Sequence, residues 1–292
     1  MTTSAVPREQ NGAFGWSAAA MLAPAAIVVA IGIVIPVVIL FRYSLNHFTP
    51  AKMMVSAVTA ENYVKFFTDP FYVAILVRTI RVAAVCTAIC VVLGFPMAYV
   101  LARTRSRYKN LMLLIVILPL FVGNAVRAAG WMVLFGNRGF VNSIAMGLGL
   151  VREPLQIMYT EFAVVVGIVA VNLPFVVLTL QASLEAIERP VEEAALGLGA
   201  GPLRAFRHVI LPLAMPGVVA ATILSFILAM NAYATPVLLG GPTFHMMGPT
   251  VYDQFAGLTN WPFGAALAFV LMAATLILTG TSNWVVHRRF RP

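Results

Sequence analysis

The chain has 292 residues, of which 61% are hydrophobic and only 10% are charged. Its 19 Lys and Arg and 10 Asp and Glu residues are too few to cover a soluble particle of this size, because soluble domains carry roughly 25% charged residues. The composition therefore excludes a soluble enzyme, a disordered chain and a secreted disulfide scaffold. It predicts an integral membrane protein, in which the net charge of +9 reflects basic residues beside apolar spans rather than a nucleic-acid surface.

Six apolar stretches are long enough to cross a bilayer as helices, which takes about 20 residues each. They are residues 18–41, 82–102, 111–135, 162–184, 213–239 and 263–286. Each must be helical, because an unpaired backbone group in hydrocarbon costs several kcal/mol. The third stretch contains one charge, Arg127, and the other five contain none. The predicted fold class is therefore all-α integral membrane, with six transmembrane helices.

The start of the chain is interpreted as a short tail followed by a retained membrane helix. Residues 1–17 form the predicted cytoplasmic tail, and the apolar run after them is too long for the core of a secretory signal. In the second span, Cys86 and Cys90 lie one helical turn apart in an apolar run. We interpret them as small packing residues rather than a metal pair or a disulfide.

Basic residues predict the orientation of the helices, because loops rich in Lys and Arg stay in the cytoplasm. The connection 103–110 holds four basic residues, and the C-terminal segment 288–292 is a basic tail. If both are inside, both termini are cytoplasmic. Residues 42–73 and 240–262 then lie outside; we expect a short surface helix over 61–67 and expect the second segment to fold against the protein at the outer membrane face.

The connection 185–212 holds four of the ten acidic residues. Pro190 suits the first turn of a helix, and the acids after it oppose the positive end of the helix dipole. A glycine-rich stretch, 197–201, then breaks this helix, and Pro202 starts a second one. The predicted structure is two short helices joined by a glycine bend. These residue types leave two interpretations open: a docking element for a partner protein, or an amphipathic connector that rests on the membrane surface.

The spacing within this connection resembles the signature loop of ABC importer permeases, E-A-A-x3-G-x9-I-x-L-P. The matching residues are Glu193, Ala194, Ala195, Gly199, Leu211 and Pro212, and Val209 stands where the pattern has isoleucine. Four further strings are similar to the spermidine/putrescine branch of these permeases: Asn62-Tyr63, Asn124-Ala125-Val126-Arg127, Gly139-Phe140-Val141-Asn142 and Trp261-Pro262-Phe263-Gly264-Ala265-Ala266.

The resemblance implies a type I ABC importer permease fold in the bacterial inner membrane. Residues 18–72 would hold the first helix and a long periplasmic loop, and 73–287 the ABC transmembrane type-1 domain. The loop would couple to two cytoplasmic ABC ATPase subunits through the matching residues and Arg204. A periplasmic binding protein would deliver the substrate, and a second permease subunit would complete a heterodimer. The implied substrates are polyamines, although related permeases handle opines, phosphonates or iron(III), and the residues do not separate these.

The chain carries no motif for chemistry of its own. It has no G-x-x-x-x-G-K-[ST] phosphate loop, no H-E-x-x-H and no G-x-S-x-G, and its four histidines are scattered. We expect a non-catalytic subunit that binds no cofactor and no metal, with ATP and Mg²⁺ used by the partner ATPase. An ion-coupled carrier or channel is disfavoured, because Arg127 is the one ionisable residue inside a predicted span.

Polar residues within spans indicate where a passage lies, because they face the bundle or a cavity rather than lipid. The candidate passage residues are Asn124, Arg127, Asn172, Asn231 and Tyr233, together with two acids placed for a cation, Glu161 and Asp253. Each asparagine has an alternative role as a hydrogen bond between helices. Arg127 has the alternative of extending to the outer membrane interface.

Overall fold

The computed structural model describes residues 13–289, and its secondary structure over this range is helical apart from one isolated pairing between His47 and Val55. Five helical segments are long and apolar enough to cross a membrane. They comprise α1 (Ala13–Ser44), α3 (Pro70–Arg103), α7 (Glu161–Glu185), α10 (Leu211–Met230) with the short helices that lead into it, and α13 (Trp261–Arg289).

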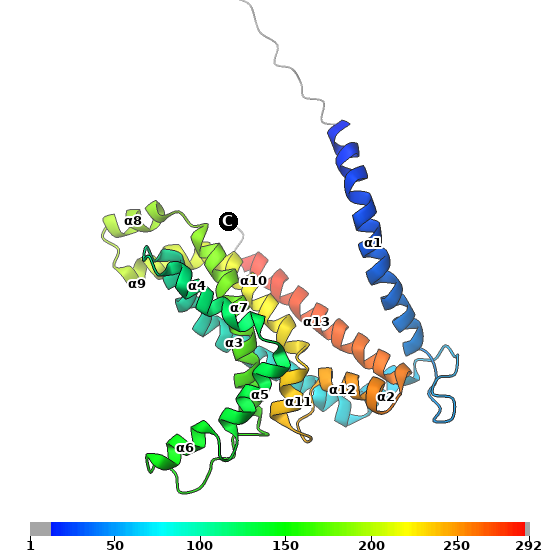
Figure 1. Cartoon of the computed structure of the whole chain (residues 1–292). Coiled ribbons are helices and arrows are strands. Elements are labelled where there is room, and N and C mark those ends of the chain that lie inside the picture. Colours follow the sequence, from blue (N-terminus) through cyan, green and yellow to red (C-terminus); the bar gives the residue numbers. More distant parts are fainter. Residues whose placement is uncertain (1–12, 290–292) are drawn as a thin grey trace, which may run out of the picture.

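Shorter helices connect these spans (Figure 1). They are α2 (Glu61–Thr68), α4 (Lys109–Ile117), η1 (Leu118–Phe121), α5 (Asn124–Phe135), α6 (Phe140–Gly147), α8 (Arg189–Gly197), α9 (Pro202–Ala205), η2 (Phe206–Ile210), α11 (Ala234–Gly240), α12 (Met247–Tyr252) and η3 (Asp253–Gly257). The surface helix predicted over 61–67 is confirmed by α2. The two short helices predicted in the connection 185–212 are confirmed by α8 and α9.

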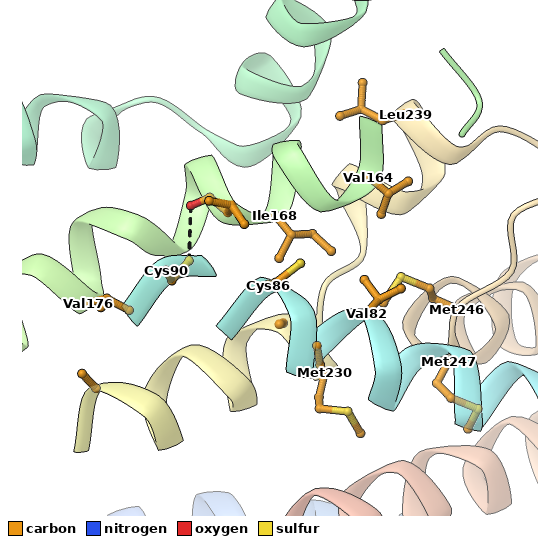
Figure 2. Packing of buried hydrophobic residues seen from close by; sticks show 14 of the residues in the cluster. Val82, Cys86, Cys90, Val164, Ile168, Val176, Met230, Leu239, Met246 and Met247 are labelled. Carbon is orange, nitrogen blue, oxygen red and sulfur yellow. Dashed lines mark hydrogen bonds between the residues drawn. The ribbon is translucent and has the colours of Figure 1, made fainter. Parts of the chain in front are cut away.

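The core of the bundle is formed where α3, α7 and α10 pack together (Figure 2). Cys86 and Cys90 of α3 are fully buried free thiols, and the Cys90 Sγ–H points at the carbonyl oxygen of Val169 on α7 at 3.7 Å. The interpretation of both cysteines as packing residues is confirmed. Close approach of α10 to α7 depends on Gly217, because a Cβ added there would lie 2.2 Å from the side chain of Ser183.

The predicted span over 111–135 is not one straight helix; it falls in a bent pair of helices, which is a sixth candidate span if the pair is counted as one. Helices Lys109–Phe121 and Asn124–Gly147 meet at an angle of 97°. The chain narrows into a 3₁₀ turn at Leu118–Phe121 with Pro119 at its start, and α5 begins only after Gly123. A hydropathy window measures only the average hydrophobicity of a segment. It does not detect this break, because the residues on both sides are apolar.

The prediction of one continuous span over 213–239 is wrong. Helix α10 ends at Met230, and α11 begins at Ala234. Pro236 has no N–H to bond the carbonyl of Ala232, so a helix cannot continue unchanged through this point. The side-chain amide of Asn231 donates a hydrogen bond to the carbonyl oxygen of Ile227 at 2.8 Å, one turn back along α10.

The second span begins earlier than the predicted residue 82. Helix α3 starts at Pro70, where the side chain of Asp69 accepts a hydrogen bond from the N–H of Phe71 at 2.9 Å. An aspartate N-cap followed by proline is a strong helix start. The sequence prediction missed this start because it required a span without charges. That requirement cut off the part of α3 that holds Arg78 and Arg81.

Helix α1 diverges from the bundle at its start and contacts α13 at its end (Figure 1). It starts at Ala13, inside the range predicted as tail, while residues 1–12 and 290–292 of the two predicted tails lie outside the described residues. No residue in its most apolar window is buried, and the edge-to-face contact of Phe41 with Phe269 of α13 lies near its end.

Figure 1 also places the start of α1, helices α8 and α9 and the end of α13 at one end of the molecule. We call this the α8 end. Helices α2, α6 and α12 lie at the opposite end, called the α12 end. The segment 240–262 folds against the bundle at the α12 end as expected. Met246 and Met247 are fully buried, and the Met247 N–H donates to the Thr79 hydroxyl of α3 at 2.9 Å.

Candidate functional site

The first candidate site is the loop at the α8 end. Its two helices are joined through Gly199, whose φ of +85° lies in the left-handed region that favours glycine. Helix α8 buries none of its residues. Glu193, Ala194 and Arg204 are exposed, and Ala195 is half-buried. The residues predicted for coupling therefore lie mostly on an open surface.

This surface is apolar as well as charged. Leu196, Leu198 and Leu203 are 42%, 90% and 78% exposed. Three large aliphatic side chains on one short loop form the kind of patch that marks a protein or membrane contact. Glu193 and Arg204 lie on the same loop and offer charges of opposite sign, which can set the register of a partner.

The end of the loop runs directly into α10. Between α9 and α10 the chain forms one wide π-helical turn, η2, in which the N–H of Leu211 bonds the carbonyl of Phe206. Pro212 explains this turn, because proline has no N–H to bond the carbonyl four residues back and its ring clashes with that carbonyl. Leu211 and Pro212 thus lie in the first turn of the helix that joins the loop to the bundle.

The loop is also tied to α3 by a set of polar contacts. The carboxylate of Glu192 accepts a hydrogen bond from the Tyr99 hydroxyl at 2.6 Å and forms an ion pair with Arg103 Nε at 3.0 Å. Arg103 donates to the carbonyl oxygen of Ile187 at 3.0 Å, and Arg189 donates to the carbonyl oxygen of Arg103 at 3.1 Å. A further ion pair, outside α3, joins Lys109 at the start of α4 to Glu185 at the end of α7 at 2.6 Å.

The second candidate site is a cavity of about 590 Å³ between α5, α7 and the break that follows α10. Its lining includes five of the seven predicted passage residues: Asn124, Arg127, Asn172, Asn231 and Tyr233. The two helix breaks supply four of them, and Asn172 reaches the cavity from the middle of α7. Asn124 and Arg127 lie in the first turn after one break, and Asn231 and Tyr233 lie in the other.

The polar groups of this cavity have different environments. Asn172 is buried and donates to the carbonyl oxygen of Ser225 on α10 at 3.2 Å, so it does join helices, as the alternative role required. Asn124 is exposed to the cavity, and its side-chain oxygen accepts a hydrogen bond from Arg127. Arg127 Nε and Nη1 are buried without a hydrogen-bond partner among the described residues. Arg127 is the charged side chain of this lining, which includes no acid.

A second cavity, of about 530 Å³, shares Asn231 and Tyr233 with the first. Its other lining residues come mainly from α12, η3 and α13. The rings of Tyr233 and Tyr252 meet here, with centroids 4.8 Å apart. The sequence analysis missed Tyr252, because it lies in a segment read as an outer connection. Asp253, the next residue, was predicted as a passage residue and pointed to this region of the chain.

The two predicted acids do not line either cavity. Glu161, at the first turn of α7, forms an ion pair with Arg81 of α3. Asp253 is exposed at the start of η3, next to Tyr252. The structure thus places acidic groups beside the passage region rather than in the cavity lining.

Comparison with known proteins agrees with this architecture. Residues 90–291 match the family described as binding-protein-dependent transport system inner membrane component. The spermidine/putrescine transport system permease protein PotB of Haemophilus influenzae is 33% identical over 235 residues, covering 80% of this chain and 82% of that protein. PotB of Escherichia coli K12 is 35% identical over 213 residues, covering 73% and 77%.

A solved structure shares the fold. A chain of a bacterial alginate ABC transporter, crystallised in complex with an alginate pentasaccharide-bound periplasmic protein, superposes with a TM-score of 0.73 at 17% identity, over 95% of this chain and 96% of that one. The helical bundle and the matches define an ABC importer permease. The chain belongs to the family of binding-protein-dependent transport system inner membrane components. It is a multi-pass inner-membrane protein of bacteria and the permease subunit of a binding-protein-dependent importer, which confirms the predicted family, fold and location.

Proposed function

We propose that this chain forms one half of a passage for polyamines, putrescine and spermidine, through the inner membrane. The observation that carries the proposal is the identity of 33–35% to PotB proteins over most of the chain. The cavity that places four polar side chains at two helix breaks supports it, because non-helical backbone at membrane depth is tolerated where it lines a cavity. In this proposal the substrate moves past Asn124, Asn172, Asn231 and Tyr233.

The aromatic pair supports a cationic substrate. Tyr233 is 40% and Tyr252 is 52% exposed, so both rings offer accessible faces. A protonated amine that rests on such a face is attracted by its quadrupole. Asp253 follows Tyr252 directly, and a carboxylate there adds to the attraction for a cation that enters from the α12 end.

A specific observation favours a second class of substrate. Arg127 contributes a positive charge to the main cavity, and the cavity lining includes no acid to balance it. This charge favours an anion such as a phosphonate, one of the alternatives that the sequence left open together with opines and iron(III). For a polyamine, the second permease subunit and the binding protein must supply the acids.

The rest of the machine follows from the proposal. The loop formed by α8 and α9 faces the cytoplasm and docks on one of two ABC ATPase subunits, with Glu193, Ala194, Ala195, Gly199 and Arg204 at the contact. Both termini then share the cytoplasmic side. A second, different permease closes the cavities, and a periplasmic binding protein docks at the α12 end. This chain is non-catalytic and binds no cofactor; ATP and Mg²⁺ are used by the ATPase subunits.

The test of the proposal is uptake of labelled putrescine, spermidine and a phosphonate in cells in which other carriers of these compounds are disabled. A strain without this chain is compared with the same strain that carries it together with its partners. Restored, energy-dependent uptake of the polyamines supports the proposal. Restored uptake of the phosphonate alone would replace polyamines with an anionic substrate, and no uptake of any of the three would contradict both.

A further inference from the structure

The polar contacts that tie α8 to α3 have a feature that ordinary packing does not explain. Helix α8 buries no residue, so apolar packing does not set its position on the bundle. Its connection to α9 is a glycine bend with one residue in the left-handed region, which is a compliant link. Helix α8 contacts α9 and η2 of its own loop, and its contacts with the membrane helix α3 are made by polar side chains.

These contacts form a compact junction made of Glu192, Arg103 and Tyr99, which we call the α8–α3 junction. The side chains of Arg103 and Glu192 are only 14% and 20% exposed. Ion pairs sheltered from water are screened less than exposed ones. The Tyr99 hydroxyl donates a hydrogen bond to one oxygen of Glu192, and Arg103 Nε lies 3.0 Å from the other as an ion pair without hydrogen-bond geometry.

Tyr99 also contacts the other branch of the loop. Its ring meets that of Phe206, in the π-helical turn before α10, edge to face at 5.9 Å, and Phe95, one turn earlier on α3, meets the same ring at 5.5 Å. A single stretch of α3 thus holds α8 through a carboxylate and the start of α10 through aromatic rings. Two separate contacts on one helix restrict rotation about either one.

We infer that the α8–α3 junction is the element that transmits displacement of α8 to the membrane helices, with Glu192, Arg103 and Tyr99 as positioning residues. The inference rests on the proposed docking of α8 on an ATPase subunit. When that subunit moves α8, the junction moves the end of α3 with it. Helix α3 packs directly on α7 and α10, so the movement reaches the cavity without passing through the glycine bend.

The test uses the complete importer, with both permeases, both ATPase subunits and the binding protein, in proteoliposomes. ATP hydrolysis and substrate uptake are measured in the same preparation. Glu192→Gln removes the charge and keeps the shape, and Tyr99→Phe removes only a hydroxyl. Glu188→Gln is the matched control, because Glu188 is an exposed acid on the same loop whose side chain makes no hydrogen bond or ion pair among the described residues.

We expect Glu192→Gln to lower the substrate transported per ATP hydrolysed by roughly fivefold or more while the ATPase subunits stay bound. Tyr99→Phe should lower it less, and Glu188→Gln should not change it. An unchanged ratio in Glu192→Gln would overturn the inference. Loss of bound ATPase subunits in that variant would also overturn it, since the junction would then serve docking alone. A wild-type complex that never binds ATPase subunits would instead remove the proposed function.

A second experiment tests the joint movement directly. Cysteines replace Glu192 and Arg103 in a chain whose buried Cys86 and Cys90 are replaced by alanine, and a bifunctional thiol reagent links them. The unlinked protein lacks the junction and should lose coupling as Glu192→Gln does; because the link rejoins the two helices, it should raise the substrate transported per ATP hydrolysed back towards the wild-type value. Transport blocked by the link would show that α8 and α3 move apart, and would overturn the inference even if Glu192→Gln is uncoupled.

Discussion

Arg81 of α3 and Glu161 of α7 form an ion pair that joins the two helices near the start of α7. Their side chains are 60% and 39% exposed, so the pair contributes at most about 1 kcal/mol to stability. The pair also occupies the carboxylate that the sequence offered as a cation site. Glu161 is therefore better described as a contact between helices.

Glu161→Gln tests this description. Because the carboxylate serves an exposed pair, we expect the KM for putrescine or spermidine uptake to change less than about twofold. Arg81→Gln is the matched control and should behave in the same way, since it removes the same pair from the other side. A tenfold rise in KM in Glu161→Gln alone would return Glu161 to the passage.

Tyr233 should act through its ring. Tyr233→Leu removes a cation–π contribution of about 0.5–2 kcal/mol, so we expect the KM for polyamine uptake to rise by about 2- to 30-fold. Tyr233→Phe keeps the ring and should stay close to the wild type. Concentration-dependent uptake with matched expression measures both. Equal loss in the two variants would assign the effect to the hydroxyl and contradict the ring contact.

The charge of Arg127 predicts opposite effects for the two substrate classes. A unit charge about 4 Å away contributes about 4 kcal/mol at an effective dielectric constant of 20, favourably for an anion and unfavourably for a cation. Arg127→Gln should therefore lower the KM for a polyamine and raise it for a phosphonate. Competition of each compound against labelled uptake measures the sign. A rise in the KM for polyamines would mean that Arg127 positions other groups.

Gly199 and Gly197 form a matched pair in the loop at the α8 end. Gly199 has a φ of +85°, whereas Gly197 ends α8 in open space. Alanine at 199 is strained by about 1–2 kcal/mol, and it should weaken recovery of the ATPase subunits with the permease. Gly197→Ala should leave recovery unchanged. Co-purification from membranes compares them, and equal recovery would mean that the bend is not needed for docking.

Gly217 should be sensitive to any side chain. A Cβ there would overlap Ser183, so α10 and α7 must separate, and overpacking of this kind costs about 1–3 kcal/mol. Gly217→Ala should lower the unfolding temperature of the purified protein. Gly280→Ala is the control, because nothing lies within 4 Å of its added Cβ. Similar unfolding temperatures for both would mean that α7 and α10 adjust freely.

Hydropathy was sufficient to predict most of the membrane helices. α7 occupies Glu161–Glu185 against a predicted 162–184, since a helix that crosses a membrane needs an apolar segment of about this length. The loop at the α8 end was predicted from prolines and glycines, which act locally. The breaks after Phe121 and Met230 were missed, because a run of apolar residues does not reveal where its backbone turns.

Contacts between distant residues were also beyond the sequence. Arg81 and Glu161 are 80 positions apart, and Tyr99 and Glu192 are 93 apart. The sequence does not show which residue a charged side chain will contact. Glu161 was therefore interpreted as a free acid, and Glu192 as one of several acids at the start of a helix. The five cavity residues were named individually, but the two breaks in the backbone explain why four of them share one cavity with Asn172 of α7.

Helix α1 has a consequence for which parts of the chain can be exchanged. Its apolar window buries no residue inside the chain, and lipid-facing surface needs hydrophobicity rather than a specific shape. Most of α1 therefore faces lipid and depends on its hydrophobicity rather than on the packing of α3, α7 and α10. Its end differs, because Ser44 is buried and Phe41 contacts Phe269 of α13, next to Ala268 in the lining of the second cavity. An unrelated apolar helix could replace the exposed part of α1, but it would have to keep these last residues.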